Sequence, residues 1–170
     1  MERCVRIIGI DPGLRATGWG VIETEGTRLR FVASGFIRPA TKTDLAQRLY
    51  RLSCELAAVL DSHRPDEAAV EETFVNADPR SALKLGQARG ICLAGPAALG
   101  CPVAEYAPNT IKKAVVGVGH ADKRQVAAMV ARLLPKAGTP ANDEADALAI
   151  AICHASHRGS FQGCGQRVAV

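Results

Sequence analysis

The sequence predicts an α/β domain built on a mixed β-sheet flanked by helices. Three strand-like segments come first, separated only by turn residues, which is typical of antiparallel hairpins. Later strand-like segments alternate with helix-like ones, as expected for parallel strands joined by crossovers. The chain of 170 residues, 48% hydrophobic and 22% charged, is long enough for one domain with its own core.

Five segments are expected to form the sheet. The first is a buried-looking apolar run stopped by Asp-Pro-Gly at 11–13, and a Glu-Gly-Thr turn at 25–27 separates the second from the third. The fourth follows Pro65, and the fifth begins at Pro102. The expected strands are 5–10, 17–23, 29–37, 68–71 and 102–106.

Helical periodicity marks the remaining segments. Leucines and valines between Leu45 and Leu60 recur at helical spacing, which predicts an amphipathic helix. The expected helices are 44–62, from about 79 into the nineties, 108–116, 121–134, and a last one from 142. Residues 1–158 are expected to form the domain, and the Gly-containing segment 159–170 a flexible C-terminal tail.

The segment "NDEADALAIAI" at 142–152 admits two interpretations. Its alternation of Ala with Leu and Ile fits a strand, but the Ala content and the start signals Pro140 and Asn142 favour a helix. A helix would place Asp143 and Asp146 on one face, with Glu144 turned elsewhere. Acids at a helix N-terminus also have a simple explanation, because they complement the helix dipole.

Two further acids end predicted strands. Asp11 ends the first strand and Glu71 the fourth, and functional groups of open α/β sheets gather at the carboxyl ends of strands. If these strands are neighbours, Asp11 and Glu71 meet, and the last helix can add Asp143 and Asp146. Four convergent carboxylates repel and require a cation, for which oxygen ligands favour Mg²⁺ or Mn²⁺. Two such ions about 3.5–4 Å apart would suit phosphodiester cleavage.

Five motifs resemble, in order and spacing, the RuvC family of Holliday-junction resolvases, from about residue 5 to 157. They are "GIDPG" at 9–13, "AVEETF" at 69–74, "ALKLGQARG" at 82–90, "VVGVGHADK" at 115–123 and "DEADALAIAICH" at 143–154.

The resemblance implies a ribonuclease-H-like fold and a homodimer that uses Mg²⁺ to nick two strands of a four-way DNA junction symmetrically, in recombination and repair. The family's acidic catalytic and metal-binding positions match Asp11, Glu71, Asp143 and Asp146, and some members have His at the third of these. A branch-migration complex of the RuvA and RuvB type is the implied partner.

The resemblance also implies residues that meet DNA. Phe74 matches a family Phe implicated in opening base pairs, although an apolar loop residue is more often a core anchor. Lys112 and Lys123 resemble lysines near the scissile phosphate, although helix lysines are usually only solvated. Arg80 and Arg89 are further candidates because their helix adjoins the active-site loop.

The helix containing 82–94 has apolar or small residues nearly all round, so it should be covered on more than one side. It is either a central core helix or, as the family implies, the two-fold dimer interface. A C2 dimer would present two equivalent sites to the related strands of a junction.

Composition and cysteine spacing indicate which partners, cellular location and metal sites to expect. The net charge of +4 weakly favours a polyanionic partner, while an aromatic content of 4% disfavours a stacking platform for single strands. No apolar run has membrane-spanning length and no signal-peptide pattern is present, so a cytoplasmic protein is expected. The six cysteines contain no CxxC pair, and "CHASH" at 153–157 lacks the paired spacing of structural zinc sites.

Other functions remain open from the residues alone. A ribonuclease H or an exonuclease would share the acids and ions, but not the motifs at 82–90 and 115–123. Sugar-kinase and actin-like ATPases share a loop like "GIDPG" but need a duplicated domain. A non-catalytic junction-binding protein would have no use for four convergent carboxylates.

Overall fold

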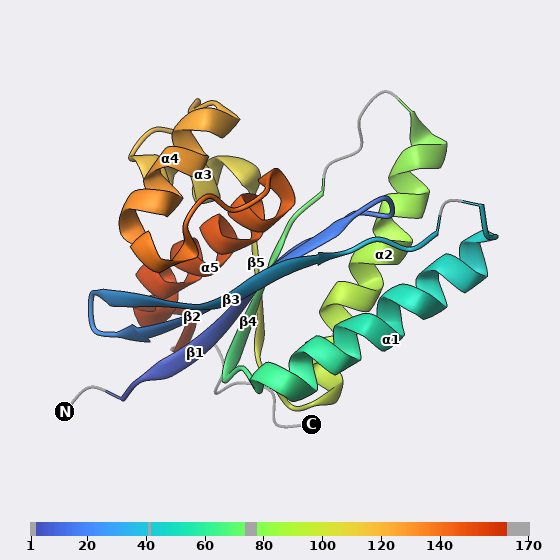
Figure 1. The fold of residues 1–170 in the computed structure, drawn as a ribbon, viewed down its shortest axis with the longest axis horizontal. Coiled ribbons are helices and arrows are strands. Elements are labelled where there is room, and N and C mark those ends of the chain that lie inside the picture. Colours follow the sequence, from blue (N-terminus) through green and yellow to red (C-terminus); the bar gives the residue numbers. More distant parts are fainter. Residues whose placement is uncertain (1–2, 41, 74–77, 163–170) are drawn as a thin grey trace.

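The structure is a computed structural model that describes residues 3–40, 42–73 and 78–162. Within these residues the chain forms one five-stranded sheet in the order β3-β2-β1-β4-β5 (Figure 1). The first three strands are antiparallel, whereas β4 and β5 run parallel to β1. The predicted mixed sheet is therefore confirmed, and the first strand is a neighbour of the fourth, which is the condition under which Asp11 and Glu71 were expected to meet. The strands are β1 (Val5–Asp11), β2 (Thr17–Glu25), β3 (Arg28–Ile37), β4 (Glu67–Glu71) and β5 (Val103–Tyr106).

The helices follow the predicted order, and 142–152 is helical. They are α1 (Leu45–His63), α2 (Pro79–Ala98), α3 (Pro108–Val116), α4 (Lys123–Leu133) and α5 (Asn142–Gln162), with a 3-10 turn η1 (Pro135–Ala137) before α5. Helix α5 continues through 159–162, so the prediction that a tail begins at 159 was wrong there. One Gly costs a helix about 1 kcal/mol, which preceding well-packed turns can offset. No helix in the described part of the chain could cross a membrane.

Helices cover both faces of the sheet. Helices α1 and α2 lie against one face, and α3, α4 and α5 lie against the other (Figure 1). Successive strand residues point to opposite faces, so β1 serves both cores. Ile7 packs in the core beneath α5, whereas Ile8 and Ile10 pack in the core beneath α1 and α2. Burial on both faces explains why Ile7, Ile8 and Ile10 of β1 are all apolar, without the polar alternation of a half-exposed strand.

Helix α5 crosses β1 and β2 at very short range. A Cβ atom added to Gly9 would lie 2.2 Å from the main-chain oxygen of Ala147, and one added to Gly18 would lie 2.0 Å from that of Asp143. Only glycine permits this approach, because any side chain would overlap the helix backbone. The glycines thus bring the N-terminal turns of α5 to the carboxyl end of β1.

Candidate active site

Three of the four predicted acids converge at one edge of the sheet. Asp11 is the last residue of β1, and Glu71 is the last residue of its parallel neighbour β4. Asp146, in the early turns of α5, faces the same point. These three acids line a cavity of about 270 Å³. The other residues of its wall are Pro108, Ile111, Lys112, Lys123, Val126, Ala149 and Ile150.

The electrostatics of this cavity reveal an excess of negative charge. Burial and repulsion from Glu71 and Asp146 raise the pKa of Asp11 to about 8. Burial also raises the pKa of Glu71, and repulsion from Asp146 adds to it, while a side-chain hydrogen bond from Asp11 opposes it. Without a cation, these shifts favour the protonated forms of Asp11 and Glu71 more than in free carboxyl groups. A positive charge bound at such a cluster would stabilise the ionised carboxylates.

Both predicted lysines reach the cavity. Lys123, the first residue of α4, places its Nζ atom 3.1 Å from Oδ2 of Asp146. The hydrogen bond to Asp146 raises the pKa of Lys123, so the ammonium stays charged. Lys112, on α3, lines the same wall, and its charge acts to lower the pKa of Glu71. The lysines offset part of the carboxylate charge and face a solvent-accessible space.

Asp143 stands apart from the other three acids. Its Oδ2 atom accepts a hydrogen bond of 3.3 Å from Nη2 of Arg38, whose guanidinium lies 3.9 Å from the ring centroid of Phe36. Glu144 turns elsewhere as predicted: it accepts hydrogen bonds from Ser34 and from the main-chain N–H of Ala141. Sequence reasoning missed Arg38, because nothing in the pattern pairs the end of β3 with α5.

The remaining candidates for DNA contact differ in their surroundings. Phe74 lies outside the described residues. Arg80 is exposed in the first turn of α2. Arg89 is half-buried: its Nε atom donates to the main-chain oxygen of Glu71 at 3.2 Å, and its Nη2 atom pairs with Glu105. Sequence reasoning did not anticipate these partners.

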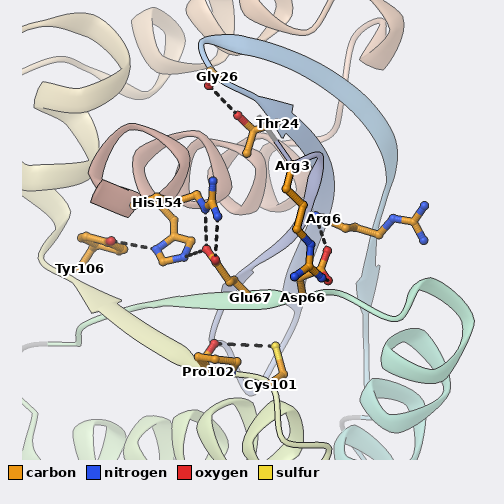
Figure 2. Close-up of polar contacts among 11 residues, drawn as sticks. Arg3, Arg6, Thr24, Gly26, Asp66, Glu67, Cys101, Pro102, Tyr106 and His154 are labelled. Atoms are coloured by element: carbon orange, nitrogen blue, oxygen red, sulfur yellow. Dashed lines mark hydrogen bonds and ion pairs between the residues drawn. The ribbon is translucent and has the colours of Figure 1, made fainter. Parts of the chain in front are cut away.

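A second polar cluster holds α5 against the start of β4 (Figure 2). Glu67 accepts hydrogen bonds from Arg158 at 2.8 and 3.0 Å, and its Oε2 atom lies 2.9 Å from Nε2 of His154. The hydroxyl of Tyr106 lies 2.9 Å from Nδ1 of the same, fully buried histidine. His154, from the "CHASH" segment, therefore belongs to a buried hydrogen-bond network. It lies eight residues after Asp146 on the same helix, at the opposite end of β4 from Glu71.

A larger cavity lies elsewhere, beside the β2–β3 hairpin and η1, with a volume of about 660 Å³. Two carboxylates line it, Glu23 and Glu25, and Glu23 is paired with Arg6 and Arg30, which hold the pKa of Glu23 below its usual range. That cavity has a compensated charge and a mostly apolar lining. The smaller cavity with uncompensated acids is therefore the better candidate for chemistry.

The donor set at the smaller cavity fits a hard divalent cation. Carboxylate oxygens are the ligands that Mg²⁺ and Mn²⁺ prefer, and burial together with repulsion from neighbouring acids raises the pKa values of Asp11 and Glu71. Within the described residues, no group of three or more Asp, Glu, His or Cys side chains is arranged to hold a metal ion. The carboxylate oxygens of the site are therefore suitable ligands for Mg²⁺ or Mn²⁺, but the described side chains are not arranged as a formed metal site.

Known proteins resemble this chain over nearly its whole length. The family profile of crossover junction endodeoxyribonuclease RuvC matches residues 7–154. The enzyme of that name from Rhizobium johnstonii is 59% identical over 160 residues, covering 94% of this chain and 95% of that protein. The one from Agrobacterium fabrum is 61% identical over 159 residues, covering 94% of each chain.

Solved structures of Holliday junction resolvases are also similar to this chain. Thermus thermophilus RuvC in complex with a Holliday junction substrate has 34% sequence identity and a TM-score of 0.85, and the match covers 92% of this chain and 96% of that one. A yeast mitochondrial Holliday junction resolvase, 12% identical with a TM-score of 0.68, shares the fold. The predicted ribonuclease-H-like fold is thereby confirmed. The chain belongs to the RuvC family of crossover junction endodeoxyribonucleases, nucleases that hydrolyse DNA phosphodiester bonds.

Proposed function

We propose that this nuclease resolves four-way DNA junctions with Mg²⁺, using Asp11, Glu71, Asp143 and Asp146 as metal-binding and catalytic acids. The observation that carries the proposal is the convergence of three partly buried carboxylates and two lysines on one cavity. The Thermus thermophilus relative, in complex with a junction, supports the choice of substrate. Action on chromosomal DNA would take place in the cytoplasm.

The acids would hold two Mg²⁺ ions, for which Mn²⁺ could substitute. When bound, these ions supply an activated water and stabilise the leaving oxygen. Asp11 and Glu71 would bind the ions in their ionised forms, because only ionised carboxylates are good ligands. Asp143 must leave Arg38 to join them. Lys112 and Lys123 would orient the substrate through the oxygens of the DNA backbone.

Two copies of the chain are proposed to act together through α2. Leu83 on this helix is 72% exposed, next to a shallow apolar hollow lined by Pro79, Ala82, Leu83, Gly86 and Gln87. Large exposed apolar residues beside small ones suit a self-complementary contact across a two-fold axis. A C2 dimer would give paired nicks at symmetric positions. The branch-migration complex of the RuvA and RuvB type is the proposed partner on the same junction.

Cleavage assays with four-way junction, linear duplex and RNA–DNA hybrid test the substrate. In Mg²⁺, the junction should be nicked at two symmetric positions, leaving ligatable 5′-phosphate and 3′-hydroxyl ends. Linear duplex should bind only through salt-sensitive phosphate contacts and resist cutting. Preferential digestion of the hybrid would favour a ribonuclease H, and single unpaired nicks would argue against the dimer.

The acids are tested by Asp11→Asn and Glu71→Gln. Each amide keeps the shape but loses the charge that holds the ions, so junction binding should survive and cleavage should be lost. A variant that cuts at the wild-type rate would remove that residue from the mechanism. Replacing Mg²⁺ with Ca²⁺ should likewise permit binding with little cutting, because Ca²⁺ has a larger and looser coordination shell.

A further inference from the structure

The peptide group that joins Glu71 to Glu72 is held from both sides. The N–H of Glu72 donates to the main-chain oxygen of Tyr106 at 2.9 Å, and the carbonyl of Glu71 accepts from Nε of Arg89 at 3.2 Å. Because a peptide group is planar, two opposed hydrogen bonds fix its orientation. They thereby restrict the backbone that aims the Glu71 side chain into the cavity.

Arg89 is itself restrained. Its Nη2 atom pairs with Oε2 of Glu105 on β5, and Glu105 is aligned with Val70, the residue before Glu71. Nε and Nη2 are adjacent donors on one planar group, so the guanidinium bridges α2 to the ends of two strands. Only 21% of its side-chain surface is exposed. An arginine whose guanidinium already makes these two contacts is poorly placed to bind the phosphates of a DNA backbone.

The need for such a restraint follows from the position of Glu71. The pairing of β1 with β4 ends at Ile10 and Val70, so Glu71 lies one residue beyond the support of β1. Its carboxylate also shares one cavity with those of Asp11 and Asp146, which are groups of like charge. Repulsion of this kind pushes a side chain away from its neighbours unless its backbone is fixed.

We infer that Arg89, itself held by Glu105, is a positioning residue that fixes Glu71 for cleavage and is not a contact to DNA. The inference rests on the proposed function of Glu71 as a catalytic acid. It replaces the expectation, drawn from the neighbourhood of its helix, that Arg89 meets DNA. A misplacement of about 1 Å can cost a reaction about 100-fold in rate, so the restraint should act on turnover.

The test separates turnover from binding. Arg89→Ala, Arg89→Lys and Glu105→Ala are compared with wild type and with Arg132→Ala, an exposed arginine on α4 in the other helical layer. The single-turnover cleavage rate is measured at saturating junction in Mg²⁺. The junction Kd and its salt dependence are measured in Ca²⁺. Urea unfolding midpoints identify variants that fail to fold.

The inference predicts that Arg89→Ala and Glu105→Ala both cut about 10–100-fold more slowly, with junction Kd within about 2-fold of wild type. Arg89→Lys should not restore the rate, because an ammonium cannot present two adjacent donors on one plane. Arg132→Ala should match wild type. If Arg89→Ala does not fold, Glu105→Ala still tests the inference. Glu105 is exposed, and its truncation removes the ion pair that holds Arg89 while the Arg89 side chain remains in place.

A DNA contact would give the opposite pattern. Arg89→Ala would then weaken binding and reduce its salt dependence, Arg89→Lys would restore it, and Glu105→Ala would bind as well as wild type or more tightly. That pattern would overturn the inference, as would wild-type cleavage by both alanine variants. Glu71→Gln separates the two proposals: if it cuts normally, the assignment of Glu71 has failed, whereas an inactive Glu71→Gln beside fully active Arg89 variants refutes only the restraint.

Discussion

Replacing Gly18 with alanine should damage both the stability and the active site of this nuclease. The added Cβ atom would lie 2.0 Å from the main-chain oxygen and 2.7 Å from the carbonyl carbon of Asp143. Ordinary contacts begin near 3.4 Å, so either β2 or the first turn of α5 must move by about 1.4 Å, the difference between 3.4 and 2.0 Å. Both atoms belong to the helix backbone, and no side-chain rotation can relieve the overlap.

The size of the effect follows from the cost of overpacking a well-packed core. Such insertions typically cost about 1–3 kcal/mol, and a backbone clash falls at the upper end of that range. For a domain of this size each kcal/mol lowers Tm by about 2–4 °C, so we expect a loss of about 4–12 °C. The shift of α5 would also carry Asp143 and Asp146 away from Asp11, so the cleavage rate should fall at least about 10-fold.

Differential scanning calorimetry and junction cleavage, both at one protein concentration, measure the two effects. Gly159→Ala is the matched control, because Gly159 lies on the same helix and an added Cβ meets nothing within 4 Å. It should leave the cleavage rate unchanged and Tm unchanged or slightly raised. A Gly18→Ala protein with wild-type Tm and cleavage rate would refute the account of how α5 is seated.

Three further predictions concern other residues. Burial lowers the pKa of His154, and Arg158 and His154 outweigh burial to lower that of Glu67, so the unfolded chain binds protons more readily at both groups. The unfolding free energy by which wild type exceeds Glu67→Gln, measured by urea titration, should therefore shrink as pH drops below 4.5, and a difference that does not change with pH would argue against an ionised, paired Glu67. Phe74→Ala should bind junctions but cut slowly, with a smaller loss on a junction with unpaired bases at the crossover; equal losses would indicate a core anchor. Lys123→Gln should lower the slope of log Kd against log salt by about 1, and an unchanged slope would remove this lysine from the DNA contact.

The fold was predictable because its signals are local. Asp-Pro-Gly after β1, the turn after Glu25 and the helical spacing of α1 each set an element boundary within a residue or two. The end of α5 was not predictable in this way. Gly159 weakens a helix locally, but the preceding turns of α5 are buried against the sheet, and that tertiary support is invisible in a sequence window.

The site was predictable where it depends on strand ends and less so where it depends on side-chain partners. Asp11 and Glu71 meet because parallel neighbours end at one edge of a sheet. The pairing of Asp143 with Arg38 joins residues 105 positions apart, and nothing local indicates it. Arg89 was assigned to DNA by proximity alone, since its bond to the main chain of Glu71 depends on how α2 packs.

The late position of α5 in the chain has a consequence for biosynthesis. Ribosomes deliver the N-terminal strands first, and α5 begins only at Asn142. Until it emerges, Asp146 is missing from the site, and the face of the sheet with Gly9, Gly18 and Ile7 lacks the helix that covers it. A nascent chain that lacks α5 therefore exposes an apolar face of the sheet and has only two of the three acids of the cavity, so the complete site forms only after α5 has been synthesised.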